Sequence, residues 1–592
     1  MLLYSLLHLF GYGNLSKEDL MNFRQLDSKT PGHPEYGHTV GVEATTGPLG
    51  AGMGMAVGMA MAEAHLESVF NKENYPVVDH YTYVLGGDGC MMEGISSEAF
   101  SLAGTLGLSK LIVLYDSNRI SIEGSTDIAF RENVQERMQA FGFQTITVED
   151  GNDIDAIGKA IEAAKADTEH PSFITIKTQI GFGCPAKQGK ASAHGEPLGV
   201  ENVEALRKNL NWPSEEPFFV PEEVYKNYSE IAEQKAEVEA AWNVMFAAYC
   251  EEYPEMEALW NQYHNAKAGE ALKDDAGFWA KQEKPEASRA ISGRLINYIK
   301  DVLPNLFGGS ADLAPSNKTN MKDAGDFSKE DRAGRNLHFG VRELAMAAIG
   351  NGIMLHGGLR AYVSTFFVFS DYCKPMARLS ALMGVPLTYV FTHDSIGVGE
   401  DGPTHEPIEQ MAALRAMPNF HVFRPCDATE TEAAWYSAVT SEHTPTALVL
   451  TRQNLEPMAG SSREALKGGY IIDDCEGTPE LILIASGSEV ALAVHAKETL
   501  AAEGQKVRVV SMPCMDLFEE QSEEYKESVL PREVRRRVAV EALGSFGWDK
   551  YTGLDGKIIA MESFGASAPA GLLFKKFGFT VEHVVEVAKS LK

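Results

Sequence analysis

The sequence contains few cysteines, fewer basic than acidic residues and no long apolar run. Its seven cysteines are odd in number and scattered, which predicts reduced thiols in a cytoplasmic protein and neither a disulfide framework nor a zinc site. The 52 Lys and Arg residues face 83 Asp and Glu residues, for a formal net charge of −31. We therefore expect no nucleic acid partner. We also expect no membrane association, because no apolar run approaches the roughly 20 residues of a membrane helix.

The length and composition indicate a globular protein of several domains. A chain of 592 residues is longer than one hydrophobic core supports. Strand-like segments alternate with helical segments along the chain. This alternation predicts an α/β protein of three consecutive domains, with mostly parallel sheets flanked by helices. The expected domains cover residues 1–265, 286–455 and 468–592, and residues 266–285 are expected to link the first two.

The apolar pattern also predicts individual elements. Residues 1–10 are expected to form a buried helix that ends at Gly11, and residues 52–64 a helix of small residues. Further helices are expected over 341–356 and 367–383. The expected strands are short apolar runs, at 80–85, 111–115, 361–366, 386–392, 446–451, 480–485, 506–512, 537–542 and 557–562. The first two of these are expected to be buried.

Gly87-Asp88-Gly89 follows one expected strand, and Asn118 follows the next. A sharp glycine turn would let Asp88 face a cation, with the Asn118 side chain and the Ile120 carbonyl as further oxygen ligands. Such hard ligands suit Mg²⁺ or Ca²⁺ carrying a diphosphate. The carboxyl ends of parallel strands are where open α/β sheets bind ligands. The pattern resembles the diphosphate motif of thiamine diphosphate enzymes; an ordinary Asp-Gly turn beside an unrelated Asn is the alternative.

Glu343 opens an expected helix that is rich in Ala and Gly, after the stretch HFGVR. The positive end of the helix favours the ionised carboxylate. One interpretation is a first-turn glutamate that stabilises its helix. The other is a carboxyl group that hydrogen-bonds a nitrogen of the thiamine pyrimidine and relays a proton during cofactor activation.

Phe366, Phe369 and Tyr372 stand three residues apart on the helix expected after a strand. They are interpreted as an aromatic pocket for the pyrimidine. An ordinary core stripe is the alternative.

The stretch THDSIGVGEDGPTHEP at 392–407 follows another expected strand and combines two His with four acidic residues among Gly and Pro. Its composition and place predict a site loop. Zinc is disfavoured, because His393 and His405 have no helical register. A plain surface loop is the second alternative.

Taken together, these motifs resemble the transketolase family. The similarity extends along the whole chain and includes further stretches: TPGHPE at 30–35, TTGPLG at 45–50, GFG at 181–183, His194-Gly195, FGGSADLAPSN at 307–317 and RPCD at 424–427. The resemblance implies thiamine diphosphate with Mg²⁺ or Ca²⁺ and a homodimer whose active sites lie at the subunit interface. It also implies that the first domain binds the diphosphate, that the second binds the pyrimidine and that the third serves in dimer packing.

The resemblance assigns a role to each matching residue. Asp88, Asn118 and Ile120 would bind the metal. The cofactor would be lined by Gly47, Pro48, Leu49, Gly87, Gly89, Asn118 and His194, and by Glu343, Phe366, Phe369 and Tyr372. Glu343 would relay the proton. His33, Asp401 and His405 would contact ketose hydroxyls, and His33 and His405 would take part in catalysis. The substrate phosphate would be bound by Arg289, Ser316, His393 and Arg452.

The implied reaction moves a two-carbon ketol unit from a ketose phosphate of the xylulose 5-phosphate type to an aldose of the ribose 5-phosphate type. It would proceed through a thiamine ylid and a dihydroxyethyl adduct. The sequence begins about 70 residues later than is usual in the family, so two histidines of a Gly-His-Gly-Ser region have no counterpart. The alternative is therefore a cofactor-binding protein with weak or no turnover, and an amino-terminal piece from another chain is a further possibility.

Overall fold

The computed structural model describes residues 1–265 and 267–591, which pack as two compact units. The first unit comprises Met1–Asn261, Phe327–Gly334 and Asn351–Gly357. The second comprises Gln262–Asp326, Arg335–Gly350 and Gly358–Lys592. The expected linker begins at residue 266 and the expected third domain ends at residue 592, and these two positions lie outside the described residues.

The first unit is built on a four-stranded parallel sheet with the strand order β1-β2-β6-β5. Its strands are β1 (Thr82–Gly87), β2 (Leu111–Ser117), β5 (Gln144–Val148) and β6 (Ser172–Lys177), and a small ribbon joins β3 (Ile120–Ser121) to β4 (Gly124–Ser125). The parallel arrangement follows from the helix that separates consecutive strands. It brings the carboxyl ends of β1, β2 and β6 to one edge of the sheet.

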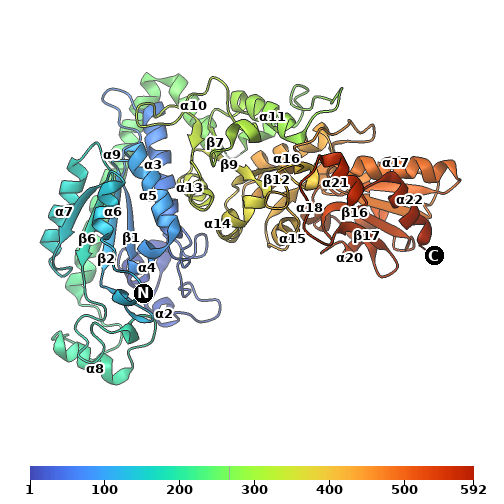
Figure 1. The fold of residues 1–592 in the computed structure, drawn as a ribbon. Helices are drawn as coiled ribbons and strands as arrows, with labels where there is room; N and C mark the ends of the chain where they lie inside the picture. Colours follow the sequence, from blue (N-terminus) through green and yellow to red (C-terminus); the bar gives the residue numbers. More distant parts are fainter. Residues whose placement is uncertain (266, 592) are drawn as a thin grey trace. The chain divides into compact units, whose positions relative to one another are not determined.

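Helices cover both faces of this sheet, and Figure 1 shows it between α7 on one side and α3 with α5 on the other. The helix of small residues is longer than expected, since α3 runs over Ala51–Phe70 and is buried along most of its length. The helices of this part are α1 (Leu2–Leu9), α2 (Lys17–Met21), α3, α4 (Asp88–Met92), α5 (Gly94–Leu106), α6 (Val134–Ala140), α7 (Ile154–Ala166), α8 (Val200–Asn209), α9 (Glu222–Glu252) and α10 (Pro254–His264).

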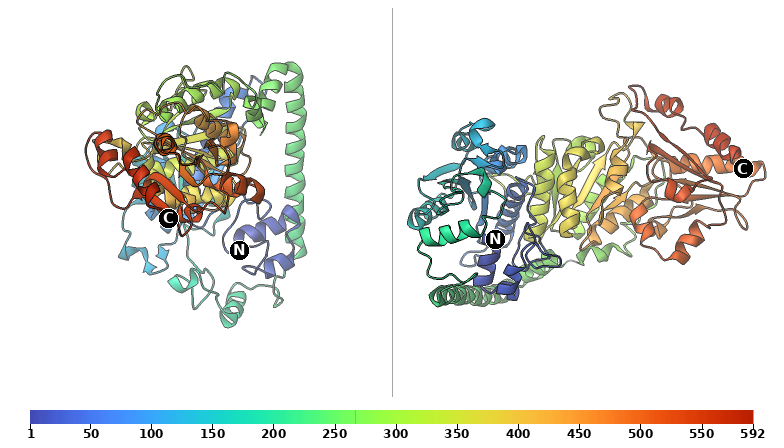
Figure 2. Two further views of the ribbon diagram at one scale, coloured as in Figure 1. Left: turned by 90° about the vertical axis from the view of Figure 1, so that its right-hand side faces the viewer. Right: turned by 90° about the horizontal axis from the view of Figure 1, so that it is seen from below.

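Helix α1 forms as expected, but only one of its faces is buried. It ends before Gly11, whose φ of 74° is the left-handed conformation that glycine adopts freely. Tyr4 and Leu7 are buried, whereas Leu2 is 68% exposed. A helix with one packed face leaves its other apolar side chains in solvent. Figure 2 shows α1 beside the start of the long helix α9, where His8 Nε2 lies 3.1 Å from the Tyr225 hydroxyl.

The expectation of a buried first strand is wrong for β1. Tyr83 is 48% exposed and Leu85 is 61% exposed, while Thr82 and Gly86 are buried or nearly so. β1 lies at the edge of its sheet, and side chains alternate between the two faces of a strand. One face of β1 therefore has no cover from the described residues of its own unit.

The second unit contains a six-stranded parallel sheet with the order β11-β12-β10-β9-β7-β8. Its strands are β7 (Leu306–Ser310), β8 (Asn336–His338), β9 (Arg360–Phe366), β10 (Thr388–Thr392), β11 (His421–Phe423) and β12 (Thr446–Leu450). Three of these, β9, β10 and β12, were expected from sequence. β7 and the two three-residue strands were not, because glycine dominates β7 and the others are too short for an apolar pattern to register.

The helices around this sheet are α11 (Ser288–Val302), α12 (Ala314–Asn317), α13 (Glu343–His356), α14 (Ser370–Met383), α15 (Gln410–Arg415) and α16 (Ala428–Thr440). The expected helix 367–383 is divided, because Phe367–Phe369 form a 3-10 turn before α14 begins at Ser370. Glu343 is the first residue of α13, as the sequence predicted.

A five-stranded sheet follows in the same unit, with the order β13-β15-β14-β16-β17. Four of its strands match the expected apolar runs, and β13 is an addition that pairs antiparallel with β15 at the sheet edge. The strands are β13 (Tyr470–Asp473), β14 (Leu481–Ala485), β15 (Val507–Ser511), β16 (Arg537–Gly544) and β17 (Lys557–Met561). The helices are α17 (Glu489–Ala502), α18 (Met515–Glu519), α19 (Glu523–Val529), α20 (Asp549–Thr552), α21 (Ala570–Lys576) and α22 (Val581–Ser590).

Alternate residues of β14 enter two different cores. Leu481 and Leu483 pack with α17 and α22, whereas Ile482 and Ile484 pack with α18 and α20. A strand buried on both faces reads as a continuous apolar run, which explains why this part of the fold was predictable. None of the described helices is long and apolar enough to cross a membrane.

A buried ion network joins this last sheet to the loop after β10. Arg424 is fully buried, lies 2.8 Å from Asp394 and is also paired with Glu489. Glu541 lies 3.9 Å from Arg424 and accepts two hydrogen bonds from Arg415, each of 2.8 Å. We call these five residues the Arg424 network. Burial acts against the charge on Arg424, but the three carboxylates outweigh it and raise its pKa.

Replacing Arg424 by methionine is expected to destabilise the protein by about 3–5 kcal/mol, because buried carboxylates would lose their counterion. The urea midpoint, followed by tryptophan fluorescence, measures this. One of the six tryptophans, Trp548, belongs to this region, and its indole donates to Glu541 at 2.8 Å. Arg535→Met is the control, since Arg535 pairs with Asp555 on the surface and exposed pairs contribute at most about 1 kcal/mol. Equal midpoints for the two variants would contradict the prediction.

Candidate active site

The predicted metal ligands lie at the carboxyl edge of the first sheet. Gly87 pairs with Asp116 in the register of β1 and β2, so Asp88 and the residues after Ser117 emerge side by side. The glycine motif does not form the expected free turn, because the chain passes directly from β1 into α4, which begins at Asp88. We call Asp88, Asn118 and Ile120 the cation group.

Asp88 is 4% exposed and is held from both sides. Its Oδ1 accepts a hydrogen bond from the Tyr115 hydroxyl at 2.6 Å, and its Oδ2 accepts one from the backbone N–H of Arg119 at 2.8 Å. The guanidinium of Arg119 turns away and pairs with Asp127 at 2.6 Å. Asp88 is thus a buried carboxylate without a basic partner in the described part of the chain.

Arg119 sits between the two other members of the cation group in a left-handed conformation, with φ of 60°. Residues other than glycine adopt this conformation at a cost of about 1 kcal/mol or more, and such strain gathers at functional sites. Here the bend allows Asn118 Oδ1 to accept a hydrogen bond of 2.9 Å from the Ile120 N–H.

The cation group fits a hard divalent ion. It offers a carboxylate, a side-chain amide oxygen and a backbone carbonyl, the oxygen ligands that Mg²⁺ and Ca²⁺ prefer. A buried carboxylate needs a compensating positive charge, and no described side chain supplies one to Asp88. The donor set and the missing counterion therefore both favour a metal at this position.

The Gly47–Leu49 segment and His33 lie together in the same unit. Gly47 has φ of 139°, and a Cβ at this position would come within 3.2 Å of the His33 ring. A Cβ at Gly89 would come within 2.9 Å of Leu49, so the segment also touches the start of α4. His33, Pro48 and Leu49 are exposed. The structure therefore brings these predicted residues together and leaves them open to a ligand or partner.

His194 follows β6, the strand next to β2, and is exposed at the end of the 3-10 turn Ala191–Ala193. A cavity of about 780 Å³ lies near this connection and is lined by Asn118, Ile120, Lys177 and Gln179 among others. A separate cavity of about 300 Å³ reaches Asp88 and Tyr115. Arg119 lines both cavities. No contact between His194 and the cation group is found in the described residues.

In the second unit, parallel strands gather most of the other predicted residues at one edge. Ser316 follows β7, Phe366 ends β9, His393 follows β10 and Arg452 follows β12. Arg289 stands at the start of α11. We call Arg289, Ser316, His393 and Arg452 the phosphate group.

The phosphate group contains a connected set of hydrogen bonds. Arg289 Nη1 donates to the Ser316 carbonyl at 2.8 Å and lies 3.4 Å from Nε2 of His393. His393 Nδ1 lies 2.8 Å from the Thr392 hydroxyl, which donates to Asn317 Oδ1 at 2.7 Å. These partners make Nε2 the acceptor and Nδ1 the protonated nitrogen of a neutral imidazole. Burial, followed by Arg289, Arg452 and His405, lowers the pKa of His393 to about 3.

The two arginines of this group repel each other and have no carboxylate partner in the described part of the chain. Burial and then Arg452 lower the pKa of Arg289. A surface ion pair would be the simplest explanation for each arginine alone. Neither arginine forms an ion pair with a described residue. Guanidinium groups near each other without a counterion suit a phosphate, whose oxygens match their geometry.

Phe366, Phe369 and Tyr372 form an aromatic series, although not on one helix. Phe366 ends β9, Phe369 lies in a 3-10 turn and Tyr372 lies in α14. The Phe366 and Phe369 rings are 6.1 Å apart and nearly parallel, and Phe369 and Tyr372 are 6.0 Å apart. Tyr372 is 59% exposed. The expectation of one helical stripe was wrong because the strand continues through Phe366.

The aromatic series also touches both histidines of the loop after β10. The Phe366 ring lies 3.8 Å from the His393 ring, and the Phe369 ring lies 5.5 Å from the His405 ring. Glu343 is half-buried, and its carbonyl accepts a contact of 3.5 Å from the Cys373 thiol of α14. Asp401 is exposed. The structure thus joins the aromatic series to the phosphate group through His393.

The loop at 392–407 is not a plain surface loop. Residues 392–399 are buried, and Asp394 is a member of the Arg424 network. His393 adopts φ of 65°, again a left-handed conformation at a polar site. The loop is therefore anchored at its first half and exposes mainly residues 400–401 and 403–404.

Three residues of these sites were missed by sequence reasoning. Tyr115 holds Asp88, and Thr392 and Asn317 fix the tautomer of His393. Thr392 ends β10 and Tyr115 lies near the end of β2, which was a usable signal, whereas Asn317 lies at the end of α12. Their partners could not be inferred, because they lie 27, 75 and one position away along the chain.

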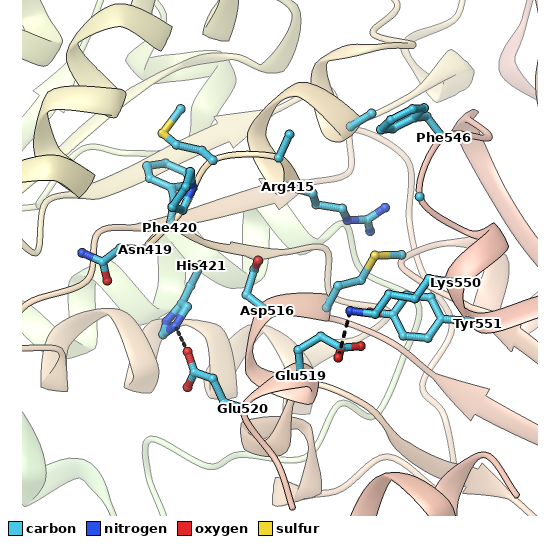
Figure 3. A pocket seen from close by; sticks show the side chains of 16 residues that line it. Arg415, Asn419, Phe420, His421, Asp516, Glu519, Glu520, Phe546, Lys550 and Tyr551 are labelled. Carbon is cyan, nitrogen blue, oxygen red and sulfur yellow. Dashed lines mark hydrogen bonds and ion pairs between the residues drawn. The ribbon is translucent and has the colours of Figure 1, made fainter. Parts of the chain in front are cut away.

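Another cavity, of about 410 Å³, lies away from the predicted residues, between the start of β11 and helices α18 and α20 (Figure 3). Most of its charged groups are paired. Glu519 lies 2.9 Å from Lys550, and Glu520 lies 3.3 Å from His421. Asp516 also lines the cavity, and its Oδ2 has no hydrogen-bond partner among the described residues.

Three family models match consecutive parts of the chain. The transketolase thiamine diphosphate binding domain matches residues 1–268, the transketolase pyrimidine binding domain 284–458, and the transketolase-like C-terminal domain 468–580. The transketolase of Halalkalibacterium halodurans is 54% identical over 597 residues, which span 100% of this chain and 89% of the relative. The chain belongs to the transketolase family.

Solved transketolases have the same fold. A transketolase from Leishmania mexicana superposes with a TM-score of 0.96 at 46% identity, over 100% of this chain and 88% of the other. A Pichia stipitis transketolase in complex with sedoheptulose-7-phosphate superposes with a TM-score of 0.94 at 45% identity, over 100% and 87%. The α/β fold of three transketolase domains is thereby confirmed.

The family fixes the class of chemistry. The chain is a thiamine diphosphate-dependent transketolase, an enzyme that transfers a two-carbon ketol unit, and its family uses a divalent metal ion with the cofactor. The prediction of family, cofactor and reaction type from the glycine motif, Glu343 and the loop at 392–407 is confirmed.

Asp88→Asn is expected to weaken thiamine diphosphate binding about 100-fold or more and to make it insensitive to added Mg²⁺ or Ca²⁺, since even indirect partners of metal sites contribute about 10- to 100-fold. Calorimetric titration with and without the ion measures this. Asp155→Asn, at an exposed position of α7, is the control. An unchanged, metal-dependent affinity in Asp88→Asn would show that the ion binds elsewhere.

Proposed function

We propose that the predicted residues form two halves of one active site. The cation group, Gly47–Leu49, Gly87, Gly89 and His194 would hold the diphosphate of the cofactor through Mg²⁺ or Ca²⁺. Glu343 and the aromatic series would hold its pyrimidine ring. The observation that carries this assignment is the buried carboxylate of Asp88, which has hydrogen-bond donors but no counterion among the described side chains.

Bound thiamine diphosphate would supply the nucleophilic carbon and the electron sink needed to break the bond between the second and third carbons of a ketose. Glu343 would donate or accept a hydrogen bond at a pyrimidine nitrogen and hold the proton that leaves during activation. Glu343 is the first residue of α13, at the positive end of that helix. The aromatic series would exclude water from the ring.

The substrate would be oriented from its two ends. The phosphate group would bind the terminal phosphate, with Arg289 and Arg452 as donors and neutral His393 as a hydrogen-bonding partner. His33, Asp401 and His405 would contact the hydroxyls near the reacting carbons, and His33 and His405 would move hydroxyl protons. His405 suits this role because its ring lies beside Phe369, next to the phosphate group.

We infer a ketose phosphate donor of the xylulose 5-phosphate type and an aldose phosphate acceptor of the ribose 5-phosphate type. The sedoheptulose-7-phosphate complex of the Pichia stipitis relative supports a sugar phosphate as substrate. The two unpaired arginines of the phosphate group support the same inference from this chain's own residues.

The active enzyme would be a homodimer in which each site combines the diphosphate half of one subunit with the pyrimidine half of the other. The distribution of the two halves over separately packed units supports this arrangement. The proposed domains remain 1–265, 286–455 and 468–592, with 266–285 as linker, and each domain holds one of the three large sheets. The described cysteines form no disulfide, which supports a cytoplasmic location.

Glu343→Gln is expected to lower ketol transfer by about 10²- to 10⁴-fold, because it removes a proton-transfer group but keeps the shape of the side chain. Transfer from a ketose phosphate to an aldose phosphate and calorimetric titration of the cofactor are measured in parallel. The cofactor should still bind. Glu330→Gln, at an exposed position, should behave as wild type, and a fully active Glu343→Gln would refute the relay.

Mixing the Asp88→Asn and Glu343→Gln proteins tests the shared site. If each site draws on both subunits, a mixed dimer contains one site with both native residues, and random exchange should restore about a quarter of wild-type activity. Each variant alone should stay inactive. If both residues acted within a single subunit, mixing would restore no activity. Light scattering that showed a strictly monomeric protein would also refute the dimer.

A further inference from the structure

The loop after β10 interlocks with the segment that follows β17. A Cβ at Gly402 would overlap the Ser567 hydroxyl, and a Cβ at Gly399 would come within 3.4 Å of the Ala568 carbonyl. From the other side, a Cβ at Gly565 would overlap Oε2 of Glu406. Gly402 and Gly565 therefore leave room for the Ser567 and Glu406 side chains where the two segments meet. We call 399–406 and 562–570 the two latch segments.

Glu406 is the one acidic side chain enclosed between the latch segments within the described chain. It is 2% exposed, and neither of its carboxyl oxygens has a hydrogen-bond partner. An ionised carboxylate in such a place has no counterion and pays a large desolvation cost. The geometry therefore accommodates the neutral acid and disfavours the anion.

The environment of Glu406 also favours the neutral acid. Burial raises the pKa of Glu406 to about 7, and the backbone amide of Ala566 acts weakly in the opposite direction. The nearest titratable groups along both segments are half-buried His405 and exposed Asp401, Glu400, Glu409 and Glu562. None of these side chains contributes to the shift.

We propose that Glu406 is a positioning residue: its neutral carboxyl lets the latch segments close and hold His405 and Asp401 in place, and its ionisation opens the latch. The proposal rests on the substrate role given above to His405 and Asp401. It gives the third domain a part in substrate binding, because residues 562–570 form the closing surface.

The direction of the pH effect follows from linkage. An acid whose pKa is higher in the closed state than in the open state favours closure at low pH, and closure is lost as pH rises between the two values. With 4.5 for an open, solvated glutamate and about 7 in the closed state, the ratio of closed to open latch falls about 20-fold between pH 5.5 and pH 7.5. Above this range it changes little.

Glu406→Gln tests the proposal, because glutamine has the same shape and cannot ionise. Steady-state kinetics of the cofactor-loaded enzyme at pH 5.5 and 7.5 give KM for the ketose phosphate. The ratio of wild-type KM to Glu406→Gln KM should rise by up to about 20-fold between these pH values. Dividing by the variant at each pH removes every pH effect that the two proteins share. Glu409→Gln, an exposed glutamate three residues away, should show the wild-type profile.

Hydrogen exchange of the latch segments gives a readout that needs no turnover. At pH 7.5 wild type should exchange faster than Glu406→Gln over 399–406 and 562–570, and at pH 5.5 the two should agree. Gly565→Ala, which cannot close on Glu406, should exchange fast at both pH values with an unchanged unfolding midpoint. Equal exchange of wild type and Glu406→Gln at both pH values would overturn the latch. Faster exchange with an unchanged KM ratio would support the latch and refute the substrate role of His405 and Asp401.

Discussion

The fully buried guanidinium of Arg424 is the interaction on which the geometry of the second unit depends. It ties Asp394, in the loop after β10, to Glu489 at the start of α17 and to Glu541 in β16. Burial alone would raise the pKa of Glu541, but Arg415 and Arg424 outweigh it and lower the pKa to about 2. A buried charge set of this kind adds little net stability compared with apolar packing, and it is intolerant of losing one member. It therefore fixes where the loop begins, and His393 is the residue just before Asp394.

The second organising constraint is the parallel sheet. Every strand of the first two large sheets runs in the same direction as its neighbours, so residues that are distant in sequence emerge at one edge. This placement explains how Ser316, Phe366, His393 and Arg452 come together. The carboxyl edge of each of these two sheets also has one residue in a strained conformation, Arg119 in the first and His393 in the second, and the surrounding hydrogen bonds hold it in place.

Two local sites carry charge that the surrounding protein does not balance, although the protein as a whole is strongly acidic. The net charge of −31 would repel a sugar phosphate, yet Arg289 and Arg452 form an uncompensated basic spot beside a neutral histidine. Asp88 is the reverse case, a buried acid without a basic partner among the described residues. Each imbalance supports the ligand proposed for it, a phosphate at the arginines and a metal ion at Asp88.

The sequence by itself determined the family, the order of the domains, most of the long strands and the identity of the residues at strand ends, because these follow from local apolar patterns and short motifs. It could not determine that β1 is an exposed edge strand, that Phe366 ends a strand or that residues 392–399 are buried. Nor could it pair Tyr115 with Asp88, Thr392 with Asn317 or Glu406 with Gly565. Those facts were decided by the tertiary structure, because burial and hydrogen-bond partners depend on segments that meet only after the sheets have assembled.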